Sequence, residues 1–400
     1  MTRIILVSGK GGVGKTTVAA ATAVAASAKG YKTLVLSFDL AHSLSDSFDL
    51  GDALFDHHAG EPVTIRENLD LQEIDIQQDL DRHWGDTYKF SAAILGGSGL
   101  SQVASQELGL LPGIEDLVAL MCLNQHLKGA IYDVIVLDSP PTSESLRFVN
   151  FSTTIDWYAR KRLGIDRRIA GMARPIVKTL NANQQFVPED SYYDSMQHLF
   201  ERLQGVDQTL RDPAVTTVRL VSNPEKMVVR ETQRAFMYFN MYGMTTDQVV
   251  LNRIFPKSDG YLQQWAELQS KRATEIQGYF EPVPVVPMPY FPYEIVGLER
   301  LGLFARQLYG DTDPTSRFVD APAYGFKKVA DGHYTLTLHL PFSNRKQIKL
   351  SRQGEDLTIS IGTFRRNVLL PRKISLLPTR SAAMDNERLV VHFGGAQIAG

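Results

Sequence analysis

The chain has 400 residues, of which 44% are hydrophobic and 22% charged, with a formal net charge of −2 and a single cysteine. This composition is typical of a globular protein with a large core, and the length suggests two or three domains. No uninterrupted apolar stretch of about 18 residues occurs, no leader peptide is recognisable, and no intrachain disulfide is possible. We therefore expect a cytoplasmic protein with no integral membrane span, and its near-neutral charge gives no reason to expect a nucleic-acid partner.

Short apolar runs alternate with helical stretches along the first 310 residues. Strands are predicted at 3–8, 32–39, 130–138, 218–222 and 248–252, and helices at 15–28 and 294–308. Two further regions, 79–127 and 151–210, are predicted to be mainly helical, and the proline-rich stretch 282–292 to be extended or looped. The alternation indicates an α/β fold with a doubly wound, mainly parallel sheet covered on both faces.

The last part of the chain has a different pattern. After a predicted linker at 311–322, apolar residues alternate with polar ones over 334–340, 348–350, 357–361 and 389–393. This period of two predicts a small all-β sandwich at 323–400. From Gly325 onward the chain holds 12 Lys and Arg against 5 Asp and Glu. This basic charge either faces the acidic remainder of the chain and solvent or meets an anionic partner.

A phosphate-binding motif stands between the first strand and the first helix. Gly9–Thr16 reads GKGGVGKT, which matches the G-x-x-x-x-G-K-[ST] pattern in its required context. Its backbone N–H groups are predicted to cradle phosphates, while Lys15 pairs with the β- and γ-phosphates and Thr16 ligates Mg²⁺ directly. The same glycines also fit the dinucleotide pattern G-x-G-x-x-G, which would not need Lys15 and Thr16; binding of ATP with Mg²⁺ but not NAD would separate the two.

Two acidic residues follow predicted strands. Asp39 and Asp138 each end an apolar run, and the carboxyl ends of parallel strands are where ligands bind in such sheets. A nucleotide hydrolase needs an acid near its metal and a group that positions water, so both are candidates; each could instead be a helix cap.

Three segments resemble the deviant Walker A, switch I and switch II motifs of the ArsA/GET ATPases, which comprise arsenite-pump ATPases and ATPases that guide tail-anchored membrane proteins. These segments are KGGVGKTT (10–17), SFDLAHSLSDSF (37–48) and LDSPPTSESLRF (137–148), with further support at 111–120, 224–235, 244–253 and 287–301. The likeness covers an ATPase domain at about 1–310, which would contain the helical regions as a client-type subdomain.

The resemblance implies a homodimer with ATP or ADP and Mg²⁺ at the interface. In it, Lys10 acts in trans, Asp39 positions the hydrolytic water, Asp138 lies in the outer shell of the metal, and Asn252 reads adenine. The nucleotide-binding residues would be Gly9, Lys10, Gly11, Gly12, Val13, Gly14, Lys15, Thr16, Thr17, Asn252, Pro287 and Pro289. For Asn252, a strand-end amide that satisfies its own turn is the alternative.

Several positions depart from the family pattern. Phe38 and Leu40 replace the Thr and Pro of switch I, and switch II reads Pro140-Pro141-Thr142-Ser143-Glu144. Cys122 stands alone, so no zinc site is expected, and no cysteine cluster for arsenite exists. The methionines of FMYFNMYGM, Met237, Met241 and Met244, are expected to lie on a core helix and to pack in the protein interior. The expected client region is instead 94–127 with 155–210, where apolar residues either line a groove or pack in helices: Leu108, Leu110, Leu111, Ile114, Leu117 and Leu120.

The tail resembles the α-crystallin domain of small heat-shock proteins, through HYTLTLHLPF (333–342), EDLTISIG (355–362) and AMDNERLVVHF (383–393). The whole chain is similar to the branch of the family found in cyanobacteria and plastids. We therefore expect an ATP hydrolase whose dimer opens and closes to bind and release a hydrophobic protein client or membrane-protein segment. The alternatives are an ATP-driven regulator of a membrane complex and a metalloid-pump subunit.

Overall fold

The computed structural model describes residues 2–39, 43–51, 60–75, 114–161, 164–169, 171–172, 190–257, 260–319 and 322–394. It divides into two compact units. The first comprises 1–4, 16–210 and 295–315, and the second comprises 5–15, 211–294 and 316–400. Strand β1 (Arg3–Gly9) and helix α1 (Lys15–Ala28) therefore begin in one unit and end in the other.

The first unit carries four strands in the order β3-β4-β2-β5, next to the first residues of β1. Strand β2 (Thr33–Ser37) pairs in parallel with both β5 (Val134–Asp138) and β4 (Leu69–Glu73), while β3 (Val63–Arg66) pairs antiparallel with β4. Every residue of β2 and β5 is buried. This burial explains their continuous apolar sequence and confirms the predicted strands of a parallel sheet.

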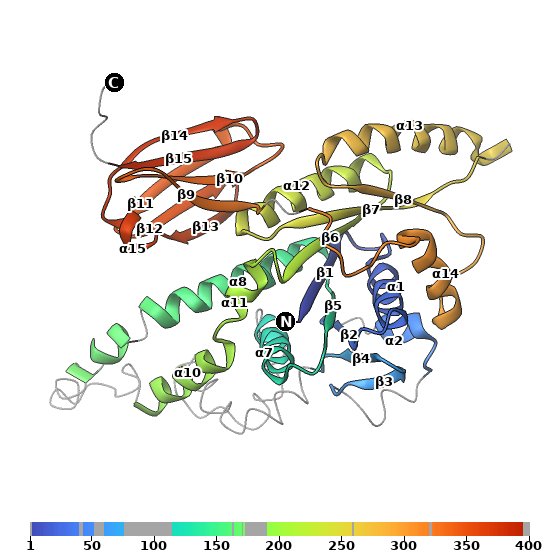
Figure 1. Cartoon of the computed structure of the whole chain (residues 1–400), viewed down its shortest axis with the longest axis horizontal. Coiled ribbons are helices and arrows are strands. Elements are labelled where there is room, and N and C mark those ends of the chain that lie inside the picture. Colours follow the sequence, from blue (N-terminus) through green and yellow to red (C-terminus); the bar gives the residue numbers. More distant parts are fainter. Residues whose placement is uncertain are drawn as a thin grey trace, which may run out of the picture. The chain divides into compact units, whose positions relative to one another are not determined.

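The helices of the first unit include most of α1 and six more (Figure 1). They are α2 (Ser43–Phe48), α7 (Ile114–Gly129), α8 (Thr142–Lys161), α10 (Asp190–Leu203), α11 (Val206–Arg211) and α14 (Gly297–Tyr309). The described parts of the two regions predicted to be helical lie in α7, α8, α10, α11 and the helical residues 164–169. Residues 76–113 and 173–189 lie outside the described residues, and Leu108, Leu110 and Leu111 lie among them.

The second unit continues the parallel arrangement in the order β1-β6-β7-β8. Strand β7 (Thr246–Ile254) pairs in parallel with β6 (Thr216–Ser222) and with β8 (Val285–Pro289). Helices α12 (Lys226–Tyr242) and α13 (Gln263–Tyr279) contact these strands, and a short 3-10 turn (Gly260–Leu262) precedes α13. The proline-rich stretch is extended, as predicted, because β8 lies at the sheet edge, where a missing donor is tolerated.

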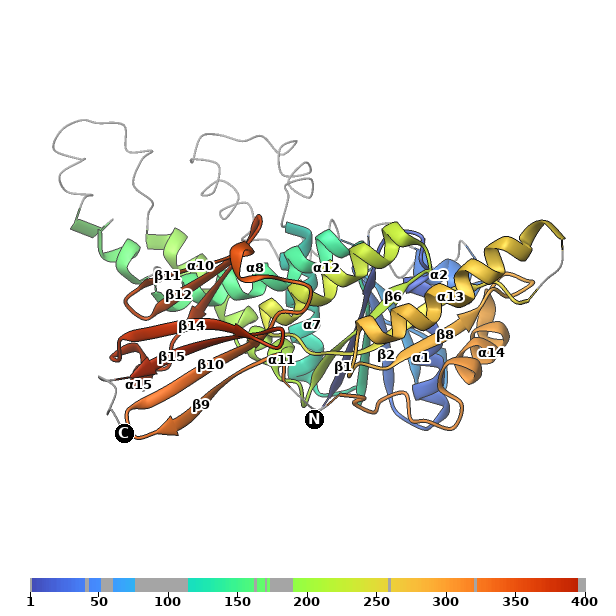
Figure 2. The same cartoon turned by 90° about the horizontal axis from the view of Figure 1, so that it is seen from above.

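The C-terminal part of this unit is all-β. One sheet has the order β14-β15-β10-β9 and the other β11-β12-β13, all antiparallel (Figures 1 and 2). The strands are β9 (Tyr324–Ala330), β10 (His333–His339), β11 (Ile348–Gln353), β12 (Asp356–Ile361), β13 (Phe364–Leu369), β14 (Thr379–Asp385) and β15 (Arg388–Gly394), with short helical turns at Arg345–Gln347 and Arg372–Ser375. Alternate residues such as Leu336, Leu338 and Ile359 are fully buried, as the period of two predicts.

Helix α12 contributes to the hydrophobic core of the β domain. Met237 and Met241 are buried in one cluster with residues of the β domain such as Leu338 and Ile359. The helix ends at Gly243, which adopts a left-handed conformation with φ 85°. The methionines therefore fill a core, as expected, but that core belongs to the β domain.

A buried arginine joins the β domain to the end of α12. The guanidinium of Arg366, on β13, donates to the carbonyl of Met241 and lies 4.2 Å from the ring centroid of Tyr324. Burial lowers its pKa to about 10. Helix carbonyls at a C-terminus attract cations, so Arg366 offsets part of its desolvation there.

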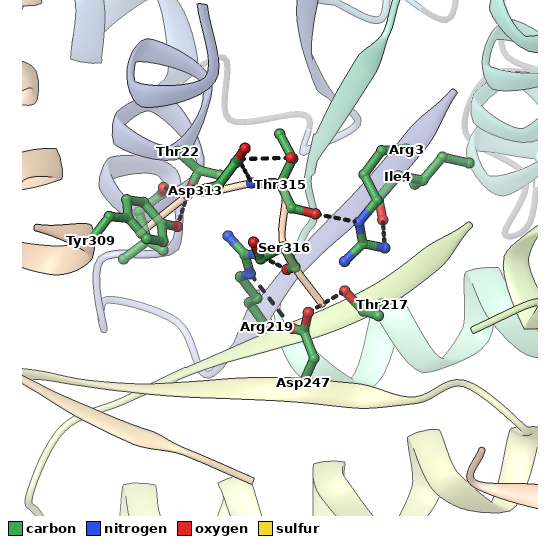
Figure 3. Close-up of polar contacts among 11 residues, drawn as sticks. Arg3, Ile4, Thr22, Thr217, Arg219, Asp247, Tyr309, Asp313, Thr315 and Ser316 are labelled. Atoms are coloured by element: carbon green, nitrogen blue, oxygen red, sulfur yellow. Dashed lines mark hydrogen bonds and ion pairs between the residues drawn. The ribbon is translucent and has the colours of Figure 1, made fainter. Parts of the chain in front are cut away.

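Residues 313–316 of the predicted linker are held by hydrogen bonds. In the first unit, Arg3 Nε donates to the carbonyl of Thr315 (3.1 Å), as Figure 3 shows. The Tyr31 hydroxyl donates to Asp313 (2.8 Å). In the second unit, the buried Arg219 donates to the carbonyl of Ser316 (3.3 Å) and lies 3.5 Å from Asp247 (Figure 3). Each unit thus holds its own end of this segment.

Some elements differ from the prediction. The strand predicted at 130–138 begins only at Val134, because Ala130 has φ 49° and Ile131 is exposed. Strands β3, β4, β9, β13 and β14 were not predicted. Four of them, β3, β9, β13 and β14, lie at sheet edges, where polar residues interrupt the alternation.

Candidate nucleotide site

The phosphate loop lies between β1 and α1, as its sequence predicts. Gly12 and Gly14 have φ 78° and 98°, values that favour glycine, and they give the loop its curl. Gly14 has a second constraint, because a Cβ there would lie 2.5 Å from Nδ2 of Asn252. Only glycine fits this position without moving Asn252.

Both lysines of the motif are held near the loop in the second unit. The Nζ of Lys15 is 3.5 Å from the carbonyl oxygen of Lys10, and Lys15 is buried. The Nζ of Lys10 lies 3.9 Å from a carboxylate oxygen of Glu231 on α12. Lys10 is thus half-exposed and near an anion of its own chain.

The two residues Asn252 and Arg253, near the end of β7, contact the loop directly. Asn252 Nδ2 donates to the carbonyl of Val13 (2.9 Å), and its Oδ1 accepts from the backbone N–H of Arg253 (3.0 Å). The guanidinium of Arg253 donates to the carbonyl of Gly12 (2.8 Å). The structure therefore places Asn252 at the loop, with both ends of its amide engaged, and sequence analysis did not single out Arg253.

Pro287 and Pro289 lie on β8, next to β7. Pro287 pairs with Leu251 and Pro289 with Ile254, and the N–H of Tyr290 donates to the carbonyl of Ile254 (2.8 Å). Tyr290 also packs against Phe255, with ring centroids 5.3 Å apart. These prolines therefore lie on the strand next to the one that carries Asn252.

In the first unit, the ends of β2 and β5 bring the switch residues together. Asp138 is fully buried, and the Ser37 hydroxyl is 3.5 Å from its Oδ2. The N–H of Asp39 donates to the same hydroxyl (3.3 Å), so Ser37 links the two acidic positions. Thr16 Oγ1 lies 3.2 Å from Ser43 Oγ, while Thr17 is half-buried on α1.

Glu73 was not predicted as part of this region, and Ser43 lies in the predicted switch I segment 37–48 but was not singled out as a site residue. Ser43 is the hydroxyl partner of Thr16 in α2. The carboxylate of Glu73, at the end of β4, accepts from the N–H groups of Leu44 (2.9 Å) and Ser45 (3.1 Å). A carboxylate there complements the positive end of the short helix and fixes its start. The only sequence signal was an acid at a strand end, and the strand itself was not recognised.

The departure at Phe38 has a structural counterpart. The rings of Phe38 and Phe148 stack, with centroids 4.6 Å apart, and both are buried. Phe38 adjoins Asp39 in switch I, and Phe148 is the last residue of the switch II segment and lies on α8. The aromatic residue in place of the usual threonine therefore packs the two switch segments against each other.

The donors of the switch region suit a hard cation. Thr16 and Ser43 offer hydroxyl oxygens, and Asp39 and Asp138 offer carboxylates, which are the oxygen ligands that Mg²⁺ prefers, directly or through water. The loop offers backbone N–H groups and a lysine, which suit phosphate. Within each unit, the residues present therefore have the chemistry that a magnesium nucleotide needs, with oxygen ligands for the metal in the first unit and donors for phosphate in the second.

Comparisons with known proteins agree with these motifs. Residues 2–310 match the family model described as anion-transporting ATPase, the ArsA ATPase model. The chain belongs to the ArsA ATPase family. Residues 331–393 match the HSP20-like domain found in ArsA, which confirms the crystallin-like tail.

Individual family members are similar over most of their length. The chain is 39% identical to a protein of Aquifex aeolicus named putative arsenical pump-driving ATPase 1, over 97% of this chain and 99% of that protein. It is 36% identical to a putative arsenical pump-driving ATPase of Chlorobaculum tepidum, over 98% and 96%. It is 30% identical to the ATPase get3 of Pyrenophora tritici-repentis, over 76% and 91%. The family thus includes relatives with both kinds of name.

The remaining observations concern the single cysteine, groups that could hold a metal, and membrane-spanning helices. Cys122, the single cysteine, is buried on α7. Among the described residues, no group of three His, Cys, Asp or Glu side chains is placed to hold a metal. No helix in the described part of the chain is long and apolar enough to cross a membrane.

Proposed function

We propose that this ArsA-family ATPase is a magnesium-dependent, homodimeric enzyme that uses ATP hydrolysis to bind and release a hydrophobic protein client. The ATPase domain would span 1–310 and the crystallin-like domain 323–400, joined by 311–322. The observation that supports the chemistry best is the phosphate loop, whose conformation and neighbours suit a triphosphate.

The residues have distinct proposed roles. Lys15 pairs with the phosphates, and Thr16 holds the metal. Asp39 orients the attacking water, and Asp138 holds the outer shell of the metal. The magnesium ion supplies positive charge that neutralises the charge developing on the phosphates.

Substitutions of Lys15 and Asp39 test the proposed ATP hydrolysis. Lys15→Ala and Asp39→Asn should each lower ATP turnover about 100-fold or more, because each removes a group that stabilises the transition state. Phosphate release under saturating MgATP is the measurement. Glu275→Gln, at an exposed position of α13 outside the nucleotide motifs, is the control and should retain turnover. Full activity of Lys15→Ala would refute the assignment.

Mixing two inactive variants tests whether Lys10 acts in trans. A dimer of one Lys10→Ala and one Lys15→Ala protomer keeps one complete site, if Lys10 serves the nucleotide of its partner. Activity should therefore reappear when the two variants are mixed and allowed to exchange. If Lys10 served its own nucleotide, neither site in the mixed dimer would be complete and activity would stay absent.

An exposed apolar face supports the client proposal. Ile165, Ile169 and Met172 are 51%, 56% and 67% exposed. Ile165 and Ile169 are spaced i, i+4 within the helical residues 164–169 of the predicted client region, so these two side chains share one helix face, and Met172 lies nearby in the sequence. Apolar side chains in such a row are a feature of helix-binding surfaces.

Charged substitutions on that face test client binding. Ile169→Asp should weaken binding of a labelled transmembrane-segment peptide at least 10-fold, because the peptide would have to desolvate a carboxylate. ATP turnover should be unchanged. Leu376→Asp, at a still more exposed apolar position in the β domain, is the control. Equal peptide binding by Ile169→Asp and the parent would remove this support.

The other candidate functions make different predictions. A regulator of a membrane complex would copurify with one membrane protein in fixed stoichiometry and would not bind the peptide. A metalloid-pump role is favoured by the names of two relatives. That role would require stimulation of ATP turnover by arsenite or antimonite, and the single cysteine offers no thiol cluster within one chain.

A further inference from the structure

We infer that Arg253 is a positioning residue for the phosphate loop, acting with Asn252 as a brace that keeps the loop shaped for phosphate. This inference deepens the proposed function and rests on it. Both residues and the loop belong to the second unit, and the brace is the pair of side-chain contacts from Asn252 and Arg253 to the carbonyls of Val13 and Gly12.

The first observation is the backbone conformation of Arg253. It has φ 60°, a left-handed value that a residue with a long side chain seldom adopts. Such conformations cost free energy and persist where the surroundings fix them, often at functional sites. Here the N–H of Arg253 donates to Oδ1 of Asn252 (3.0 Å), so the turn is held by the same side chain that reaches the loop.

The second observation is the direction of the two contacts. Consecutive carbonyls of the loop, those of Gly12 and Val13, accept from Arg253 Nη1 (2.8 Å) and Asn252 Nδ2 (2.9 Å). In a planar trans peptide, the C=O of one residue and the N–H of the next point in opposite directions. Holding these carbonyls toward β7 therefore turns the N–H groups of Val13 and Gly14 the other way.

Those N–H groups are among the donors that a phosphate loop presents to its ligand. The carbonyls carry partial negative charge and must stay away from the phosphates. A guanidinium on the Gly12 carbonyl gives a charge-assisted hydrogen bond, which is stronger than a neutral one. The brace thus supplies, before nucleotide arrives, the loop conformation that nucleotide needs, and it lowers the ordering cost of binding.

The geometry also explains why Gly14 lacks a side chain. A Cβ at Gly14 would lie 2.5 Å from Asn252 Nδ2 and would displace the brace. The nucleotide motif and the end of β7, more than 230 residues apart in sequence, are therefore one structural device.

Equilibrium binding of a fluorescent ADP analogue and steady-state ATP turnover test the inference. Arg253→Ala should weaken analogue binding about 10-fold, the loss expected for one charge-assisted hydrogen bond. The turnover number at saturating ATP should change less than about 3-fold, because Arg253 faces the back of the loop. Arg253→Lys keeps a cationic donor and should recover part of the affinity.

Two controls separate positioning from a general structural role. Arg253→Gly removes the donor but suits the left-handed backbone, so it should bind as weakly as Arg253→Ala while its melting temperature without nucleotide stays equal to that of the parent or rises. Lys257→Ala, an exposed cation four residues further along, should bind like the parent.

Three outcomes of the affinity, turnover and melting measurements would overturn the inference. Affinities of Arg253→Ala and Arg253→Gly within 2-fold of the parent would refute the brace, and so would a loss confined to turnover. An affinity loss that always accompanies a lower melting temperature would reduce Arg253 to a structural residue. If the parent itself failed to bind nucleotide while Lys15→Ala behaved identically, the proposed function would fall, and the inference with it.

Discussion

The junction between α12 and the β domain predicts a large effect for Gly243→Ala. A Cβ at Gly243 would lie 2.7 and 2.8 Å from ring carbons of Tyr324 and 2.9 Å from the guanidinium of Arg366. Tyr324 cannot easily yield, because its ring lies 4.2 Å from that same guanidinium. The substitution must therefore disturb the contact that joins helix and domain.

The magnitude follows from two costs. Alanine in a left-handed conformation costs about 1–2 kcal/mol, and overpacking of a buried contact costs about 1–3 kcal/mol. We expect the free energy of opening of the β domain to fall by roughly 2–5 kcal/mol. Hydrogen exchange of amides in α12 and β13, read by mass spectrometry, measures this opening directly.

Gly302→Ala is the control for this experiment. Gly302 lies inside α14, without a left-handed conformation, and a Cβ there would meet open space. Alanine there should stabilise the helix by roughly 0.5–1 kcal/mol and leave exchange in β13 unchanged. If Gly243→Ala exchanged within about 0.5 kcal/mol of the parent, α12 would not end against Tyr324 and Arg366 in solution.

Three further outcomes are expected. Replacing Phe38 and Phe148 singly and together by Leu should give a coupling energy of about 0.5–1.5 kcal/mol in urea unfolding, and additivity would exclude the stacked pair. Burial lowers the pKa of His339, opposed in part by Glu387. The stabilisation that neutral His339 contributes is therefore fully present above the usual histidine pKa. It is lost as pH falls from that value through the lower pKa of the folded protein. Unfolding free energy should thus drop from about pH 7.5 to about pH 5.5, and His339→Gln should flatten that slope; an unchanged slope would contradict the assignment. Removing residues 323–400 should destabilise the remaining chain by roughly 3–6 kcal/mol, because two buried methionines of α12 lose their cover; an unchanged melting temperature of the shortened protein would count against the shared core.

The features that could be predicted from the sequence are those that depend on residues close together in the chain. The glycine-rich loop with Lys15 and Thr16 needs only local order, and so does the alternation that marks β10 and β12. Continuous apolar runs likewise predicted β2 and β5, since strands that are buried on both faces have no polar side. The nucleotide motif and both parts of the fold were predictable for this reason.

Only the tertiary structure decided which distant residues meet. Nothing in the spacing places Arg253 on the carbonyl of Gly12, Ser43 beside Thr16, or Met241 in the core of a domain that begins some eighty residues later. Such contacts depend on strand order and on the exit angles of turns, which local preference does not specify. The phosphate loop could therefore be recognised in the sequence. The residues that hold its conformation, Asn252 and Arg253, could be identified only from the structure, in which β7 pairs with β6.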